Sequence, residues 1–205
     1  MATYKQGILG PFSGKVGTVV GSSWRGIAYI RSLATKVANP RTAAQLEVRN
    51  KLSATSKRLR LFLSSIRRGF VSSGAASGWS AAVKFNRQYV SFDEKTGAYV
   101  FPIEDVKLSD GAKPFDVAVS NAEGVISASW EAPVAADELY GGKLYMAVYN
   151  AKNDKAANFS ASLSATDAQF NAADVLGAQG GDELHVLFFA ATGSVSTQTT
   201  HQKLS

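Results

Sequence analysis

Positive and negative side chains occupy different halves of this 205-residue chain. Residues 1–87 contain fifteen Lys or Arg residues and one acidic residue, Glu47, whereas residues 88–205 contain seven basic and fifteen acidic residues. The formal net charges of the two parts are therefore +14 and −8. A composition shift this abrupt predicts a boundary near residues 88–105, between a basic N-terminal region 1–100 and an acidic domain 101–205.

The basic region requires something that balances its charge. Positive charges spread over roughly 90 residues repel one another and disfavour a compact state. Nucleic-acid phosphates, an anionic lipid surface or an acidic protein surface could balance it, and the acidic surface could belong to this chain or to a neighbour. The alternative interpretation is a solvated basic face that only keeps the protein soluble.

The pattern of residues 14–31 predicts a β-hairpin. Two β-prone runs, Lys15–Val20 and Trp24–Arg31, flank the turn-forming residues 21–23. Alternation along the second run predicts one face that combines cations with an aliphatic and an aromatic side chain, a surface suited to phosphates and stacked bases. The alternative is that these arginines are merely solvated. The residues of that face are Arg25, Ile27, Tyr29 and Arg31.

A basic amphipathic helix is predicted over residues 42–69. Thr42 and Gln45 have the spacing of a capping box, and Gly69 marks the expected end. The apolar positions fall on one face and the cations on the opposite face. A second short helix is expected over residues 80–89. The apolar positions are Val48, Leu52, Leu59, Leu63, Ile66 and Phe70, with Phe62 at the edge.

The apolar stripe of the long helix needs a partner. About ten residues separate the two expected helices, whereas a helix-turn-helix that reads DNA has a turn of three or four. A helix lying on a membrane surface is a second alternative. Burial of the stripe against protein is the favoured interpretation.

From residue 105 onward the apolar residues recur with a period of two. Seven short strands separated by Asn, Gly and Pro turns predict an all-β sandwich, and the whole chain is therefore expected to be an α+β protein. With Trp130 followed by Glu131, Ala132 and Pro133, this part resembles an immunoglobulin-like or fibronectin-III-like domain. The expected strands are 117–119, 125–130, 143–149, 159–163, 168–172, 184–190 and 194–200.

Groups that carry catalysis or hold metals are scarce. The chain has no Cys and only two His residues, and its paired acids cluster at expected turns, where they are normally solvated. His185 lies inside an apolar run and is expected to be a packed core residue. The sequence therefore predicts a non-enzymatic protein without cofactor or metal. It contains no membrane-spanning stretch and no signal peptide, so we expect cytoplasmic synthesis.

Residues 7–32, from Gly7-Ile-Leu-Gly-Pro-Phe to Tyr29-Ile-Arg-Ser, together with Asn39-Pro-Arg-Thr-Ala-Ala-Gln45, resemble an uncharacterised family of proteins about 200 residues long, DUF6266. The resemblance is specific over residues 5–60. It implies an origin in Bacteroidetes or in their phages and prophages, and no activity. By analogy it favours a virion or assembly protein.

We therefore expect a non-enzymatic structural or assembly protein that forms homo-oligomers or binds other structural proteins. A sequence-independent nucleic-acid-binding protein is the alternative, and a carbohydrate- or receptor-binding module that uses the sandwich loops, supported by Tyr140, Tyr145 and Tyr149, is the second alternative. The residues predicted to contact nucleic acid or an acidic partner are Lys15, Arg25, Arg31, Arg49, Lys57, Arg58, Arg60, Arg67 and Arg68.

Overall fold

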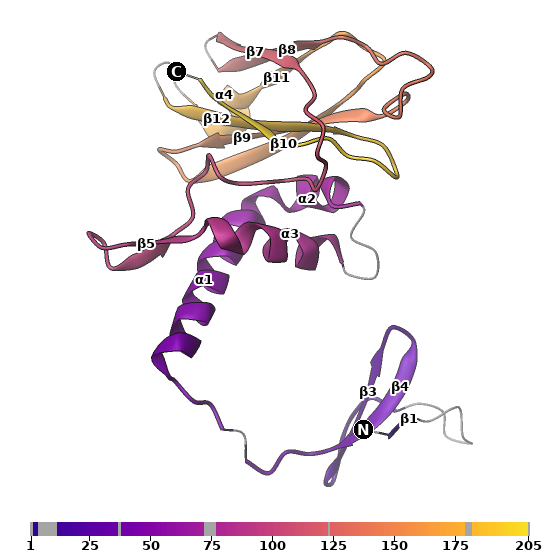
Figure 1. The fold of residues 1–205 in the computed structure, drawn as a ribbon, viewed down its shortest axis with the longest axis vertical. Coiled ribbons are helices and arrows are strands. Elements are labelled where there is room, and N and C mark those ends of the chain that lie inside the picture. Colours follow the sequence, from indigo (N-terminus) through magenta and orange to yellow (C-terminus); the bar gives the residue numbers. More distant parts are fainter. Residues whose placement is uncertain are drawn as a thin grey trace. The chain divides into compact units, whose positions relative to one another are not determined.

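The computed structural model describes residues 2–3, 12–36, 38–71, 77–122, 124–178 and 182–204. The chain divides into two compact units, Met1–Thr42 and Ala43–Ser205. It combines helices with several antiparallel sheets, as the α+β expectation requires (Figure 1). The division lies at residues 42/43, so the helical segment belongs to the same unit as the strands that follow it, and not to a separate region ending at residue 100.

The first unit is a four-stranded antiparallel sheet with the order β1-β4-β3-β2. Its strands are β1 (Ala2–Thr3), β2 (Gly14–Val16), β3 (Val19–Trp24) and β4 (Ile27–Ser32). Strands do form and pair within residues 14–31, but as the three strands β2, β3 and β4 and not as the single predicted hairpin.

The turns of this unit differ from the prediction. The chain turns after Val16 and again at Arg25-Gly26, whereas Gly21, expected in a turn, lies inside β3 opposite Ile30. Gly21 is required there by a close approach, since a Cβ at this position would overlap the carbonyl oxygen and ring of Phe12. The glycine therefore makes room for a neighbouring side chain instead of reversing the chain.

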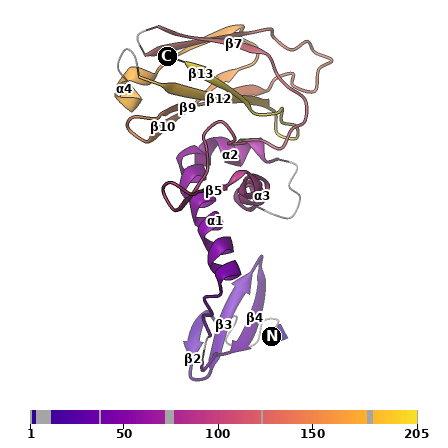
Figure 2. The ribbon, with the colours of Figure 1, turned by 60° about the vertical axis from the view of Figure 1, so that its left-hand side comes forward.

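The second unit has three layers, which Figure 2 shows with the helices beneath two stacked sheets. One sheet has the order β10-β9-β12-β13 and the other β11-β8-β7, and all pairs are antiparallel. The strands are β7 (Val117–Ala122), β8 (Val125–Trp130), β9 (Lys143–Asn150), β10 (Lys155–Ser162), β11 (Asp167–Asn171), β12 (Leu184–Ala191) and β13 (Thr200–Leu204), and the short helix α4 (Ala172–Leu176) follows β11.

Six of the seven expected strands form near their expected positions, and the seventh is displaced. Residues 194–200 were expected to form it, but β13 begins only at Thr200. The preceding residues instead serve as polar contacts: Thr197 bonds to Ala190, and the hydroxyl of Thr199 accepts bonds from the amides of Leu108 and Ser109. The predicted strand over 194–200 was therefore wrong, because a few backbone and side-chain hydrogen bonds hold this segment in place of a strand ladder.

The helical layer contains α1 (Ala43–Leu59), a 3₁₀ turn η1 (Arg60–Phe62), α2 (Leu63–Gly69), α3 (Gly78–Asn86) and η2 (Arg87–Tyr89). A small hairpin of β5 (Ser91–Asp93) and β6 (Ala98–Val100) follows. The helix expected over 42–69 ends at Gly69 as predicted, but η1 interrupts it. This turn lets Leu59, Phe62 and Ile66 all become fully buried.

Two cores share the four-stranded sheet. One lies between the two sheets, and the other lies between this sheet and the helices. Strand β12 contributes to both, so each of its eight residues is buried, including His185 at 2% exposure. The C-terminal part of the predicted apolar stripe, from Leu59 to Phe70, thus finds its partner within the chain, which explains why a charge boundary near residue 100 does not divide the structure. Val48 and Leu52, expected on the same stripe, remain 60% and 48% exposed.

Candidate interaction surfaces

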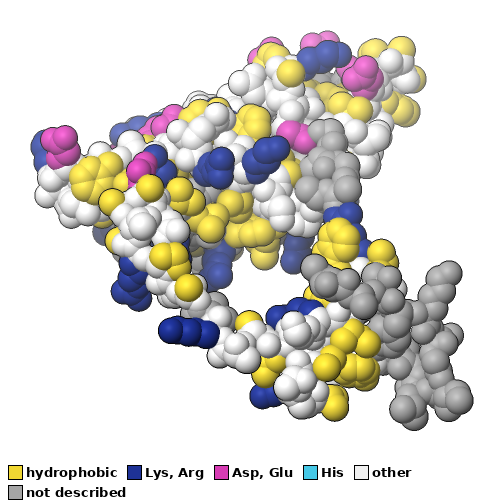
Figure 3. All heavy atoms as spheres, turned by 60° about the horizontal axis from the view of Figure 1, so that its bottom comes forward, with side chains coloured by type: hydrophobic (Ala, Val, Ile, Leu, Met, Phe, Trp, Pro, Cys, Tyr) yellow, Lys and Arg dark blue, Asp and Glu magenta, His cyan; other side chains and the backbone are white. Residues whose placement is uncertain are grey.

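The sheet of the first unit has no apolar core among its described side chains. Gly21 is its one buried residue there, whereas Val16, Trp24 and Ile27 are 65%, 62% and 53% exposed. Figure 3 shows hydrophobic side chains lying open on this unit. Large apolar side chains that remain in water contribute nothing to folding and favour contact with another surface.

One face of this sheet combines the exposed Trp24 and Ile27 with cations. Residues directly opposite each other in an antiparallel pair lie on the same face. The pairings Lys15–Val20, Val20–Arg31 and Trp24–Ile27 therefore place Lys15, Arg31, Trp24 and Ile27 together. The sequence had assigned Trp24 and Ile27 to opposite faces, because it counted Trp24 as part of the second strand.

The two-residue turn that joins β3 to β4 contains a residue that is unusual in such turns, Arg25. Arg25 has φ 50° and Gly26 has φ 80°, so both turn residues lie in the left-handed region. Two-residue hairpin turns with two positive φ values favour Asn or Asp followed by Gly. The guanidinium of Arg25 lies over the indole of Trp24, 5.0 Å from the ring centroid. The tip therefore presents a cation and an aromatic ring side by side.

The predicted basic residues of the helical layer fall into different environments. Lys57, Arg60, Arg67 and Arg68 are exposed and form no ion pair with any residue in the described part of the chain. Arg49 is also exposed. Dark-blue Lys and Arg side chains stand out on the face drawn in Figure 3.

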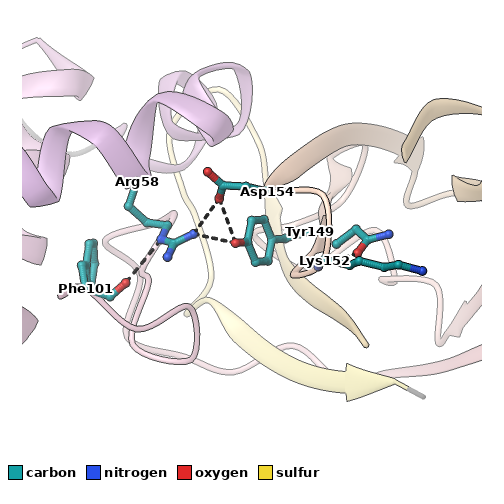
Figure 4. A network of polar contacts seen from close by, with 6 residues as sticks. Arg58, Phe101, Tyr149, Lys152 and Asp154 are labelled. Atoms are coloured by element: carbon teal, nitrogen blue, oxygen red, sulfur yellow. Dashed lines mark hydrogen bonds and ion pairs between the residues drawn. The ribbon is translucent and has the colours of Figure 1, made fainter. Parts of the chain in front are cut away.

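Arg58 differs from these residues because its guanidinium forms hydrogen bonds and an ion pair with other residues of the same chain (Figure 4). Its Nε donates to the carbonyl of Phe101 at 3.3 Å, and its Nη1 donates to the Tyr149 hydroxyl at 2.8 Å and to Asp154 Oδ1 at 3.3 Å. The Tyr149 hydroxyl also donates to Asp154 Oδ1 at 2.9 Å. Burial raises the pKa of Tyr149, and the hydrogen bond from Arg58 opposes that increase. Arg58 therefore ties α1 to the sheet.

A polar groove of about 220 Å³ lies between α2 and the adjacent part of β9 and β10. Arg68 and Lys143 supply cations to it, Ser64 and Ser160 supply hydroxyls, and Tyr145 supplies a ring. Sequence reasoning found Arg68 but missed Lys143, because Lys143 belongs to the acidic half of the chain. The period-two pattern of β9 was the available signal, since it places residues 143, 145, 147 and 149 on one face.

The three tyrosines considered for carbohydrate binding do not share a surface. Tyr140 is 62% exposed on the loop before β9, whereas Tyr149 is 6% exposed beneath the helices. Tyr145 stacks on Phe189 with ring centroids 5.4 Å apart. They form no common platform on which a sugar ring could stack.

No group of three or more His, Asp or Glu side chains suited to a metal ion occurs among the described residues. Within those same ranges, no helix has the length and apolar character needed to cross a membrane. The profile of a family of unknown function, DUF6266, matches residues 11–201, in agreement with the family expected from residues 7–45. No curated protein matches the sequence significantly.

Proposed function

Because this chain belongs to the DUF6266 family, whose function is unknown, we propose a role from its geometry. The protein is a non-enzymatic structural or assembly protein whose N-terminal unit contacts another protein subunit. One observation carries the proposal: a sheet with exposed Val16, Trp24 and Ile27 has no buried apolar residue of its own among its described residues.

The size of the first unit supports this reading. Folding units of about 40 residues or fewer usually need disulfides, metals or association, because they bury too little surface. The chain contains no Cys. Association would remove the exposed aromatic and aliphatic side chains from water and would stabilise the sheet. A neighbouring subunit with an apolar, acidic surface fits the Trp24, Ile27, Lys15 and Arg31 face.

Light scattering across a dilution series tests the proposal. We expect the mass of the purified chain to rise above the monomer mass of 21.7 kDa as its concentration increases. A monomer at every concentration and at both low and high salt would contradict self-association. The next measurement would then be light scattering of this chain mixed with each protein encoded by an adjacent gene, which tests binding to a second structural protein.

Nucleic-acid binding is a second candidate, favoured by Arg60, Arg67 and Arg68, which are exposed and have no ion partner in the described ranges of the chain. Their replacement by Ser should reduce retention of random duplex and single strands in a gel shift, and the affinity of the native chain should fall steeply with salt. Replacing three exposed lysines outside the helical layer provides a control with the same charge change. Equal losses in both variants would show that the arginines make no specific contribution. The control residues are Lys95, Lys113 and Lys155.

Two finer assignments belong to the same proposal. An immunoglobulin- or fibronectin-III-like domain is supported by the strand arrangement, because the first, second and fifth strands share one sheet and the third, fourth, sixth and seventh share the other. An origin in a phage or prophage virion is supported by the analogy drawn from residues 7–45. Capsid or tail genes beside the coding gene would support that location.

A further inference from the structure

A groove on the second unit lies where three connecting segments meet at one end of the sandwich, and its volume is about 600 Å³. Residues 112–115 precede β7, residues 136–139 precede β9, and residues 195–197 precede β13. Connections that cluster at a sandwich end are a common place for recognition, since rigid sheets hold them in position.

The lining of this groove is apolar with an acidic rim. Phe115, Leu139 and Val195 supply apolar surface, and Asp137 and Glu138 supply carboxylates. Glu138 lies 3.8 Å from Lys113, but both side chains are largely exposed, at 64% and 83%, so this ion pair is weak. The groove therefore suits a ligand with both a large apolar group and a cation.

The tip of the N-terminal hairpin has this chemistry. Trp24 and Ile27 are exposed apolar side chains directly opposite each other in the register, and Arg25, in the turn between them, holds its guanidinium over the Trp24 indole. A groove of this volume is within the range of about 300–1,000 Å³ that binds compact ligands. Trp and Arg are also the side chains that most often dominate the energy of protein interfaces.

The backbone of Arg25 provides an independent reason to assign a recognition role to the tip. A non-glycine residue with positive φ is unfavourable unless its side chain can bond locally, as Asn and Asp do. Arg has no such hydrogen bond and its φ is 50°, and within the turn its guanidinium stacks on the Trp24 indole. An outlier of this kind supports the hypothesis that the tip, with its paired cation and aromatic ring, has a recognition role.

We infer that the hairpin tip of one copy, Trp24-Arg25-Gly26-Ile27, inserts into the groove of a second copy between Phe115, Leu139 and Val195. Arg25 then pairs with Asp137 and Glu138. Tip and groove are different surfaces, so the contact is heterologous and joins subunits head to tail in a ring or an open filament. This inference rests on the proposed self-association and names the surfaces that perform it.

A complementation experiment by light scattering tests the contact. One chain carries Trp24→Ser and Arg25→Asn, which impairs the tip, and the other carries Asp137→Asn and Glu138→Lys, which impairs the groove. Each variant alone should associate at least about tenfold more weakly than the native chain, in line with the loss of one interface hot spot. Mixed together, they should form a heterodimer, because one supplies an intact groove and the other an intact tip.

Matched variants separate this contact from folding and from overall charge. Arg25→Asn suits the turn better, so a loss of association without a loss of sheet content identifies Arg25 as a contact residue. Lys95→Asn and Asp167→Lys change charge at exposed positions outside the N-terminal sheet and the groove and should leave the mass unchanged. A native chain that stays monomeric contradicts the proposed self-association. A native chain that associates while the tip and groove variants associate equally well overturns only the tip-in-groove contact.

Discussion

Arg58 and Arg60 are separated by one residue, yet their surroundings are opposite. Arg58 bonds to Phe101, Tyr149 and Asp154, and its side chain is 24% exposed, whereas Arg60 is exposed without an ion partner among the described residues. A hydrogen-bonded charge that is partly buried stabilises a fold more than an exposed one. From the charge pattern alone, Arg58 and Arg60 were predicted to make the same kind of contact with nucleic acid or an acidic partner.

Replacing Arg58 with Met should lower the free energy of unfolding by about 1–3 kcal/mol, because Asp154 and Tyr149 lose a charged donor. Arg60→Met should change it by less than about 0.5 kcal/mol. Urea denaturation followed by circular dichroism measures both. Equal effects would show that the Arg58 network does not stabilise the helix against the sheet.

The histidine pair is a second feature decided by individual residues. His185 Nδ1 lies 2.9 Å from His201 Nε2, and His185 Nε2 lies 2.9 Å from Glu183 Oε1, while Glu183 Oε2 pairs with Lys203. Burial lowers the pKa of His201, and the charge of His185 lowers it further. A hydrogen bond from Lys203 lowers the pKa of Glu183. The expectation of a packed, hydrogen-bonded His185 is confirmed.

Stability should therefore fall as the pH decreases below about 6.5, the ordinary pKa of histidine, because the unfolded chain binds a proton before His201 does. The decrease should not exceed about 1.4 kcal/mol per pH unit for one proton, and it should level off below the folded-state pKa. His201→Gln should reduce this slope in thermal melts. The contribution of Glu183 is lost only at lower pH, below 4.5. An unchanged slope would exclude His201 as its source.

At the scale of elements, one glycine determines how closely α2 approaches the chain that leads to the sandwich. A Cβ on Gly69 would overlap the carbonyl of Leu108, and the Gly69 carbonyl accepts a hydrogen bond from Asp110 at 3.3 Å. The sequence predicted Gly69 as a helix end. It contained no sign of the approach, because Leu108 is distant along the chain.

Gly69→Ala should lower the free energy of unfolding by about 1–3 kcal/mol, since the added methyl group forces the backbone apart. Gly78→Ala is the matched control: its Cβ would meet only ordinary contacts of 3.5 Å or more, so the helix preference of Ala should leave stability unchanged or raise it by up to about 1 kcal/mol. Thermal melts of the two variants compare them. A similar effect at both positions would mean that helix propensity, and not the contact with Leu108, determines the result.

At the scale of the whole molecule, the basic half of the chain contributes to two units with different stability. The helices share a core with β9 and β12, whereas the N-terminal sheet buries no apolar side chain among its described residues. Apolar packing thus joins the basic helices to the acidic sandwich. The free energy of this packing exceeds the repulsion among the cations of the basic half.

A chain that begins at Ala43 should therefore fold alone and melt within a few degrees of the whole chain in its monomeric state. A peptide of residues 1–42 should show little β-structure by circular dichroism at low concentration, because it buries too little surface. A folded, monomeric peptide would contradict the view that this sheet depends on a partner.

Periodicity determined much of this protein from the sequence alone: the hairpin region, the helix ending at Gly69 and six strands of the sandwich follow from local preferences and repeating apolar positions. Tertiary structure decided which surfaces remain available. It buried the stripe of Leu59, Phe62 and Ile66, paired Arg58 and left Trp24 and Arg60 exposed. The physical reason is that side-chain alternation is local, whereas burial and charge pairing depend on residues that meet only after the chain folds.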